Sequence, residues 1–264
     1  MIKIMEHFYS LQGEGSRMGI PSYFIRLGFC PFRCKFCDSK FALSSTKHIL
    51  SLSTDNDFRK FYSDNMYNKA FQSVVITGGE PLYVDNYDTL GKFVDFLKIA
   101  NDYHITFETT MIPDPQYLSF TNSSYNINNV LEKEIYPIFG TKNILYSVSP
   151  KFNMCAYRDF KNINLESIIN YYKIKINPSE ELLSSLNYKF VYSPDTINDL
   201  TFFVDYCIPQ SFKNNVFVMP ITPIPFDRNI YQQTCIEVAN FCKEKGLRYS
   251  SRIHIDLWGL ERGT

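Results

Sequence analysis

Residues 22–37 read SYFIRLGFCPFRCKFC, an apolar run that leads directly into three closely spaced cysteines. The run over 22–27 has the β-branched and aromatic content of a buried strand, and a glycine follows it. Cys30, Cys34 and Cys37 then stand in a Cys-x3-Cys-x2-Cys pattern on one short loop. Three thiols on a loop after a strand indicate a metal or cluster site.

Further apolar, β-branched runs recur along the chain and alternate with stretches that have helical composition. The strand-like runs cover 73–77, 104–108, 144–149, 188–193, 216–219 and 248–254, and the helical stretches include 87–100, 165–172 and 231–245. Strands that alternate with helices predict parallel βα units. With about six or seven such strands, we expect an α/β fold that forms a partial or modified (βα) barrel.

Two segments that are rich in Asn, Tyr and Ser interrupt this alternation, at approximately 113–142 and 153–187. Strands resume in the same pattern afterwards, so we interpret both segments as insertions. The chain is therefore predicted to form a single domain over residues 1–264.

Polar and glycine-rich residues follow three consecutive predicted strands. Gly78-Gly79-Glu80-Pro81 follows the first, Glu108-Thr109-Thr110 the second and Ser149-Pro150-Lys151 the third. Because βα folds gather their chemistry at the carboxyl ends of the strands, these groups are expected at one mouth of the barrel.

Composition excludes several classes of protein. The chain has 27 basic and 27 acidic side chains, and this zero formal charge argues against a nucleic-acid-binding role, which needs clustered Lys and Arg. No apolar run approaches the roughly 18 residues of a membrane span, and the N-terminus lacks a signal-peptide layout. We therefore expect a cytoplasmic protein without a membrane partner, in which the remaining four of seven cysteines, Cys155, Cys207, Cys235 and Cys242, are packing residues.

The three clustered cysteines fit an iron-sulfur cluster better than a zinc ion. A cubane cluster is ordinarily held by four cysteines, so three ligands leave one iron open to a chelating molecule. A zinc site with His48 as the fourth ligand is the alternative, but His48 lies eleven positions after Cys37 and no second cysteine pair follows.

Cys30, Cys34 and Cys37 resemble the signature of the radical S-adenosylmethionine (SAM) superfamily. The segment Thr77-Gly78-Gly79-Glu80-Pro81 resembles that superfamily's second motif, in the expected order along the chain. The resemblance implies that a 4Fe-4S cluster binds the amine and carboxylate of SAM at its open iron, and that the Gly-Gly-Glu-Pro segment meets the amine. Glycines allow close approach of the backbone, and Glu80 offers an acceptor for an ammonium group.

The flanking residues resemble one family within that superfamily, the 7-carboxy-7-deazaguanine synthases of queuosine and 7-deazapurine biosynthesis. The similar segments are 11–15, LQGEG, residues 24–28, FIRLG, and Cys37-Asp38-Ser39. Near the C-terminus His254, residues 257–259, LWG, and residues 262–263, RG, are also similar. The two insertions lie outside the resemblance, which is compatible with a divergent, phage-encoded member.

The resemblance implies a lyase reaction. Reductive cleavage of SAM gives a 5′-deoxyadenosyl radical that takes hydrogen from C6 of 6-carboxy-5,6,7,8-tetrahydropterin. The substrate radical then rearranges with ring contraction, hydrogen returns from 5′-deoxyadenosine, ammonia is lost, and 7-carboxy-7-deazaguanine is formed. SAM is regenerated, so it serves as a cofactor, and a flavodoxin- or ferredoxin-type donor supplies the electron. Family members are homodimers, which we adopt as the expectation.

The same resemblance assigns expected roles to individual residues. Arg26 is expected to pair with the substrate carboxylate, a geometry that suits its planar fork. Substrate contacts are expected from Leu11, Gln12, Gly13, Glu14 and Thr77. SAM contacts are expected from Phe36, Cys37, Asp38, Gly79, Glu80, Glu108, Thr109, Ser149 and Lys151.

The chain departs from the family at three positions. Ser39 stands where a threonine binds Mg²⁺, and it retains the hydroxyl oxygen that a hard cation accepts. Thr110 replaces an asparagine near the SAM ribose, and Met219 replaces a glutamine before a proline. We expect the magnesium site to survive with an altered affinity.

Two other functions compete with this prediction. A glycyl-radical activase is a radical SAM enzyme that acts on a protein, but Gln12 to Gly15 and the Trp258-Gly259 ending favour the pterin enzyme. A zinc-binding interaction module without enzymatic activity is the second alternative. Iron and sulfide analysis separates it from an iron-sulfur enzyme.

Overall fold

The computed structural model describes residues 1–34, 37–114, 126–151, 155–157, 165–193 and 197–263. A nine-stranded sheet forms its framework, in the order β11-β10-β9-β7-β6-β5-β2-β1-β4. In that order the strands span Arg248–Tyr249, Val216–Pro220, Leu186–Tyr192, Ile144–Val148, His104–Thr109, Ser73–Gly78, Pro21–Leu27, Ile2–Leu11 and Leu50–Leu52. The strands from β11 to β2 are parallel, and β1 and β4 add antiparallel pairings at one edge.

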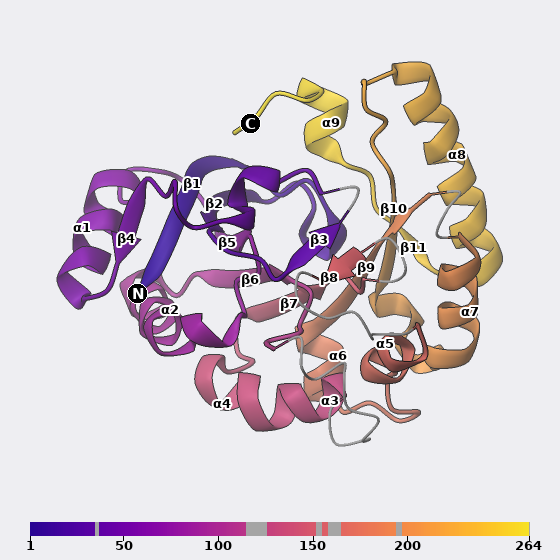
Figure 1. The fold of residues 1–264 in the computed structure, drawn as a ribbon, viewed down its shortest axis with the longest axis horizontal. Coiled ribbons are helices and arrows are strands. Elements are labelled where there is room, and N and C mark those ends of the chain that lie inside the picture. The colour runs from indigo at the N-terminus through magenta and orange to yellow at the C-terminus, as the bar shows by residue number, and fades with distance from the viewer. Residues whose placement is uncertain (35–36, 115–125, 152–154, 158–164, 194–196, 264) are drawn as a thin grey trace.

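Helices lie around the periphery of this sheet (Figure 1). They are α1 Asp55–Asn65, α2 Tyr87–Asn101, α3 Ile127–Val130, α4 Tyr136–Phe139, α5 Leu165–Tyr172, α6 Glu180–Ser185, α7 Ile197–Cys207, α8 Arg228–Lys245 and α9 Ile253–Trp258. Local sequence sets their ends: Thr54 and Asp57 form a capping box at α1, and Gly246 at φ +67° ends α8. The predicted helices over 87–100, 165–172 and 231–245 are therefore present.

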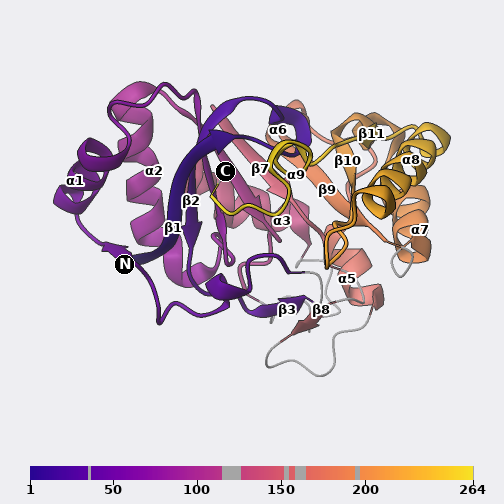
Figure 2. The same ribbon diagram turned by 90° about the horizontal axis from the view of Figure 1, so that it is seen from above.

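The sheet is curved but does not close, which confirms the predicted partial or modified barrel (Figure 2). Its order begins at β11 and ends at β4, so these two strands remain edges. Strands β2, β5 and β6 are buried on both faces of the sheet, as expected for parallel strands that helices cover.

The register of the parallel strands places the polar side chains in one row. Arg26 on β2 pairs with Thr77 on β5, and the Thr77 hydroxyl donates a hydrogen bond of 2.9 Å to Glu108 on β6. Glu108 in turn pairs with Ser147 on β7. Because alternate residues of a strand face the same side, these groups share the inner face of the sheet.

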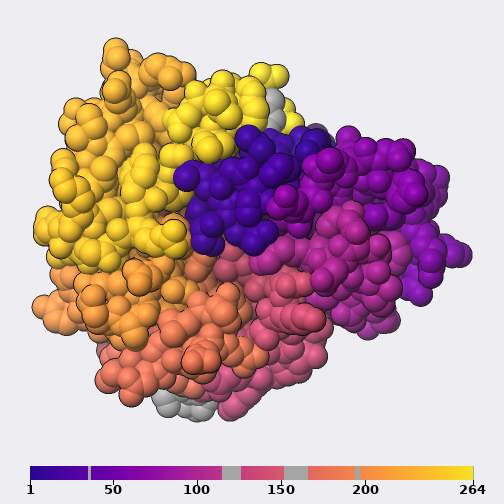
Figure 3. Space-filling view, turned by 180° about the vertical axis from the view of Figure 1, so that it is seen from behind, coloured from indigo at the N-terminus to yellow at the C-terminus, as the bar shows by residue number. Residues whose placement is uncertain are grey.

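The C-terminal segment lies against the N-terminal segment on the face shown in Figure 3, where yellow and indigo atoms adjoin. The Ile253 amide donates to the Gly13 carbonyl at 3.0 Å, and the Gly15 amide donates to the Ser250 hydroxyl at 2.8 Å. The two ends of the chain are therefore joined directly beside the inner face of the sheet.

The predicted strand over 248–254 is wrong in its second half. Only Arg248–Tyr249 is a strand, and Ile253–Trp258 forms α9. The chain leaves the sheet because its polar groups bond to the N-terminal loop, as the Ile253 and Ser250 contacts show. The segment was predicted as a strand because it was grouped with the apolar, β-branched runs, but these long-range contacts determine its backbone.

The segments 113–142 and 153–187 contain helices where they are described. The first holds α3 and α4, joined by a π-helical turn at Leu131–Ile135, and connects β6 to β7. The second holds α5, α6 and β8 Cys155–Tyr157, which pairs with β3 Phe32–Cys34 in a separate two-stranded sheet. Their status as insertions in a single domain stays a prediction. In the described ranges, no helix has both the length and the apolarity that crossing a membrane requires.

Candidate active site

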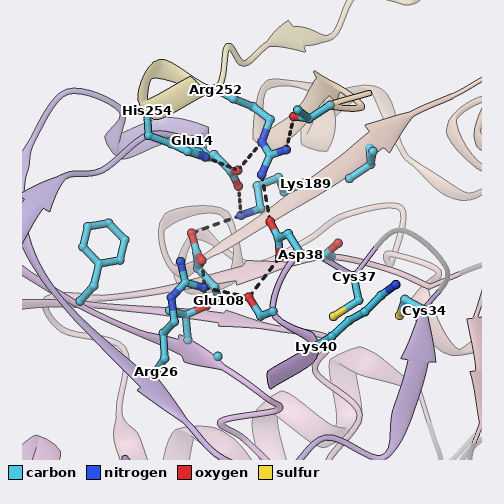
Figure 4. A pocket seen from close by; sticks show the side chains of 18 of the residues that line it. Glu14, Arg26, Cys34, Cys37, Asp38, Lys40, Glu108, Lys189, Arg252 and His254 are labelled. Atoms are coloured by element: carbon cyan, nitrogen blue, oxygen red, sulfur yellow. Dashed lines mark hydrogen bonds and ion pairs between the residues drawn. The ribbon is translucent and has the colours of Figure 1, made fainter. Parts of the chain in front are cut away.

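A cavity of about 910 Å³ opens at the carboxyl ends of the parallel strands, within the size range of small-molecule sites. Figure 4 shows the charged side chains that converge on it. With the exception of Phe36, which lies outside the described residues, every side chain or backbone position expected at the site lines this cavity. Their individual roles remain predictions.

The three clustered cysteines form one wall of the cavity. Cys30 follows β2, Cys34 ends β3, and the Cys37 amide donates to the Cys34 carbonyl at 3.2 Å. Burial, followed by the charge of Glu80, raises the Cys30 pKa to about 12, and burial raises the Cys37 pKa as well. The Cys30 and Cys37 thiols are therefore protonated without a metal, and binding one releases protons.

The arrangement of the thiols suits a cluster better than a single ion. Among the described residues, no three His, Cys, Asp or Glu side chains converge as they would on one metal ion. In a cubane each cysteine binds a different iron, so the thiols need not meet at a point. His48, the alternative zinc ligand, is exposed, and its Nδ1 lies 2.9 Å from the Ser45 carbonyl oxygen. Among the described residues His48 therefore does not gather with the clustered cysteines.

Glu80 is buried behind the cysteine wall and is saturated with donors. The Thr110 hydroxyl and amide donate to its Oε2 at 2.6 and 2.7 Å, the Leu82 amide donates to Oε1 at 3.1 Å, and the Thr109 hydroxyl also donates to Oε1. Burial raises the Glu80 pKa although these hydrogen bonds lower it. Thr110, a departure from the family pattern, thus supplies the anchor of Glu80.

The glycine beside Glu80 is required by packing within the chain. A Cβ on Gly79 would stand 1.9 Å from the Phe29 carbonyl oxygen, where no real side-chain atom fits. The Gly79 and Glu80 amides donate to the carbonyls of Leu27 and Phe29 at 2.8 Å each. The glycine therefore lets this loop bond to the backbone that leads to Cys30.

Arg26 is held on two sides and retains one free end. Its Nε lies 3.0 Å from Glu6 Oε2, a close ion pair that lacks the alignment of a hydrogen bond. One terminal nitrogen donates to the Ser39 hydroxyl at 3.0 Å. The second terminal nitrogen has no acceptor among the described residues, so it is available to a ligand in the cavity.

Ser39 and Asp38 stand between two guanidinium groups. The Ser39 hydroxyl, which accepts from Arg26, donates to Asp38 Oδ1 at 3.1 Å. Asp38 Oδ2 accepts from Arg252 at 3.0 Å. The hydroxyl and carboxylate oxygens are of the type that Mg²⁺ binds, but both already face a cation.

Glu14 is a buried carboxylate bound by two cations. Lys189 Nζ lies 2.6 Å from its Oε2 and Arg252 Nε lies 2.9 Å from its Oε1. Burial alone would raise the Glu14 pKa, but Lys189, Arg252 and His254 hold it well below its ordinary value. Glu14 is therefore ionised at every physiological pH.

Lys189 links this carboxylate to Glu108. Its Nζ lies 3.2 Å from Glu108 Oε1, which also accepts from the Gln12 side-chain amide at 3.3 Å. Burial lowers the Lys189 pKa, but Glu108 and Glu14 together raise it above its ordinary value. The ammonium is consequently charged throughout the physiological range.

Gly13 and His254 fit against each other beside Glu14. A Cβ on Gly13 would lie 2.1 Å from His254 Nδ1. His254 Nε2 is 4.0 Å from Glu14 Oε1, and burial lowers the His254 pKa, so the ring is neutral at pH 7. The C-terminal helix thus covers the loop that carries Gln12 and Glu14.

The structure adds two cations, Lys189 and Arg252, that sequence reasoning missed. Lys189 stands within the apolar strand 186–192, LNYKFVY, where a lysine is unexpected because both faces of a parallel strand are buried. A lysine inside an apolar strand could therefore have identified Lys189 as a candidate site residue from the sequence. Arg252 had no such pattern, because it precedes a short helix in a segment predicted to be a strand.

Comparisons with known proteins find similar sequences. Residues 11–125 match the model of a family described as a 4Fe-4S single cluster domain. A 7-carboxy-7-deazaguanine synthase from Pyrobaculum aerophilum is 24% identical over 264 residues, which cover 99% of this chain and 97% of the relative. The synthase of Clostridium acetobutylicum is 24% identical over 257 residues, covering 97% and 96%. The synthase of Halobacterium salinarum is 43% identical over 108 residues, covering 41% and 38%.

A solved structure supports the fold. The crystal structure of QueE from Escherichia coli aligns with a TM-score of 0.55 and 20% identity, covering 95% of this chain and 93% of that one. The predicted resemblance to 7-carboxy-7-deazaguanine synthases is thereby confirmed, as is the prediction of an enzyme of the radical SAM type.

Proposed function

We propose that this chain is a radical SAM lyase that converts 6-carboxy-5,6,7,8-tetrahydropterin to 7-carboxy-7-deazaguanine with loss of ammonia. One observation carries the proposal: a single cavity joins the three clustered thiols to Arg26 and Glu14. The first group suits a cluster, and the other two suit a carboxylated heterocycle with N–H groups. Neither a zinc module nor an activase of a protein partner requires this combination.

Cys30, Cys34 and Cys37 would hold the 4Fe-4S cluster, and the loop of Gly79 and Glu80 would lie beside SAM. When bound, the cluster and SAM supply a 5′-deoxyadenosyl radical that takes hydrogen from the substrate. The chain's own residues bind, orient and shield the reactants. In the described structure Glu80 orients the loop through Thr109 and Thr110, because these donors saturate its oxygens.

Arg26 would bind the substrate carboxylate with its free terminal nitrogen. If it also releases Ser39, both terminal nitrogens reach the carboxylate and form a bidentate pair. The Ser39 hydroxyl would then be open to Mg²⁺, together with Asp38 Oδ1 at 3.1 Å from it. Substrate binding and magnesium binding at Ser39 would therefore be coupled through Arg26.

Glu14 would accept the N–H groups of the pterin. Its ionised carboxylate is held rigidly by Lys189 and Arg252, so it loses little rotational freedom when the ligand binds. The side-chain oxygen of Gln12 accepts from the Glu14 amide at 3.1 Å and fixes the loop. Thr77 completes this wall beside Glu108.

The wider assignments follow from the same function. We infer a flavodoxin- or ferredoxin-type electron donor, a cytoplasmic homodimer and a small pterin substrate, with neither nucleic acid nor membrane as a partner. The balanced formal charge of 27 basic and 27 acidic side chains supports the exclusion of nucleic acid.

The test is an anaerobic turnover assay. Reconstituted, reduced protein is incubated with the carboxytetrahydropterin, SAM and Mg²⁺, and the product is identified by mass and absorbance. We expect a 7-carboxy-7-deazaguanine product that depends on SAM and reductant. A reconstituted cluster with no deazapurine product contradicts the proposal, and a tightly bound zinc with no iron or sulfide favours the binding module.

A further inference from the structure

We propose that Lys189 is a specificity-determining residue that, together with Glu14, reads the amide edge of the bound heterocycle. This inference rests on the proposed function because it takes a pterin as the ligand. It assigns the 4-carbonyl oxygen of that ring to Lys189 and the neighbouring N–H groups to Glu14.

Lys189 has one N–H group more than the protein uses. An ammonium carries three hydrogens, and Lys189 Nζ has two acceptors, Glu14 Oε2 at 2.6 Å and Glu108 Oε1 at 3.2 Å. Within the described ranges it has no third acceptor. The residue is only 6% exposed, yet it lines the cavity, so the remaining N–H is directed to whatever occupies that space.

Glu14 has acceptor capacity to match. A carboxylate offers about four lone-pair sites, two on each oxygen. Lys189 occupies one site on Oε2 and Arg252 occupies one on Oε1, which leaves one site on each oxygen. Figure 4 shows the Glu14 carboxylate directed toward Lys189 at the same side of the cavity. The protein thus presents two acceptors beside one donor.

The two acceptor sites of Glu14 and the free N–H of Lys189 complement one edge of a guanine-type ring. The edge carries an exocyclic amine and a ring N–H, both donors, followed by a carbonyl acceptor. Acidic side chains accept from such amino groups, and lysine donates to the equivalent carbonyl of guanine in protein–DNA contacts. A ring with an amino group in place of the carbonyl would bring a second donor against Lys189.

Glu108 explains how the lysine is held in place. It accepts from Thr77 at 2.9 Å through Oε2 and from Gln12 at 3.3 Å through Oε1, so it is anchored independently of the ligand. Lys189 is therefore fixed between one anchored carboxylate and one carboxylate that faces the ring. A purely structural role would need the charge of Lys189 but not its third N–H.

The experiment compares two ligands by equilibrium dialysis against reconstituted, unreduced protein that holds SAM. One is 6-carboxypterin, and the other is 2,4-diaminopteridine-6-carboxylate, which has an amino group in place of the carbonyl and no hydrogen on the ring nitrogen. For Lys189→Met we expect the dissociation constant of 6-carboxypterin to rise roughly 5- to 150-fold, from a contact of about 1–3 kcal/mol. The constant for the diamino compound should change less than about threefold.

Lys175→Met is the matched control. Lys175 also pairs with a glutamate, Glu132 at 2.9 Å, but the pair is exposed and lies outside the cavity. Its binding constants should equal those of the wild type. If Lys189→Met does not fold, the same measurement is made on the double variant Lys189→Met/Glu108→Gln. This variant removes one charge of each sign.

The two proposals fail in different ways. A wild type that forms the deazapurine product, with a lysine variant that loses affinity for both ligands equally or keeps the full preference, overturns the role of Lys189 alone. A wild type that neither binds 6-carboxypterin nor forms the product overturns the proposed function and this inference with it.

Discussion

Thr106 and Thr110 offer a matched test of what holds Glu80. Both are nearly inaccessible, at 2% and 6% exposure, and both lie on or directly after β6. The Thr110 hydroxyl donates to Glu80 at 2.6 Å, whereas the Thr106 hydroxyl has no hydrogen-bond partner among the described residues. Substitution of either threonine by valine keeps the branched shape and removes one hydroxyl.

The expected effects differ in size and in sign. Thr110→Val removes a hydrogen bond to a buried carboxylate, which contributes about 1.5–3 kcal/mol to stability. The Glu80 Oε2 atom keeps the Thr110 amide at 2.7 Å, so it is not left unpaired. Thr106→Val removes a buried hydroxyl that pairs with nothing, and its effect should be about zero or slightly stabilising.

Anaerobic thermal unfolding of the reconstituted variants measures this contrast. At roughly 2–4 °C per kcal/mol, Thr110→Val should lower the midpoint by about 3–12 °C, and Thr106→Val should leave it within about 2 °C. Equal losses in both variants would refute the reasoning. So would a larger loss in Thr106→Val.

The same pair predicts a pH dependence. Burial raises the folded Glu80 pKa above its ordinary value of 4.5, so its contribution to stability is greatest below that pH and falls as the pH rises through the folded pKa. Loss of the Thr110 hydroxyl raises the folded pKa further. The deficit of Thr110→Val relative to the wild type should therefore be larger at pH 8 than at pH 5, and a deficit that shrinks with pH would contradict this assignment.

Three further variants test other parts of the site. Cys34→Ala should abolish both the cluster spectrum and turnover. The control is Cys207→Ala, at a buried free cysteine on α7 outside the cavity, which should leave both intact. Full activity of Cys34→Ala would show that Cys34 does not hold the cluster. Arg26→Ala should raise the apparent KM at least about tenfold, through the lost carboxylate contact, with an unchanged cluster spectrum, and an unaltered substrate response would exclude Arg26 from the substrate site. Gly13→Ala places a Cβ 2.1 Å from His254 Nδ1, so it should cost about 1–3 kcal/mol in thermal or urea unfolding, and wild-type stability would show that the ring moves freely aside.

The sequence predicted those features of the fold and site that depend on neighbours along the chain. The strands before the cysteines and before Gly78 were found because each is a short apolar run with a glycine at its end. Strand β1, Ile2–Leu11, which lies between β2 and β4, was not predicted, because its partly exposed side chains lack the clean alternation of a half-buried strand. The prediction of a strand over 248–254 was wrong beyond Tyr249. There the backbone is positioned by hydrogen bonds to residues 13–15, which are distant in the sequence.

The charged network could not be predicted for a related reason. Lys189 bonds to Glu14 across 175 positions and Arg252 bonds to it across 238 positions. No periodicity within a strand or helix encodes such pairs. Arg26 and Glu14 were identified by their motifs, but what holds them in place, Glu6 for one and two cations for the other, appears only when the chain is folded.

The two walls of the cavity are therefore specified in different ways. The cysteine wall needs only eight consecutive positions from Cys30 to Cys37, and the matched cluster domain ends at residue 125. The opposite wall needs Lys189 and Arg252, which lie beyond that domain and reach Glu14 from β9 and from the segment before α9. The cysteine wall can support a reaction step that is common to many substrates. Discrimination among heterocycles must come from groups that contact the edges of the ring. Because those groups are brought together only by distant parts of the chain, the choice of substrate can change by substitutions that leave the cysteine motif untouched.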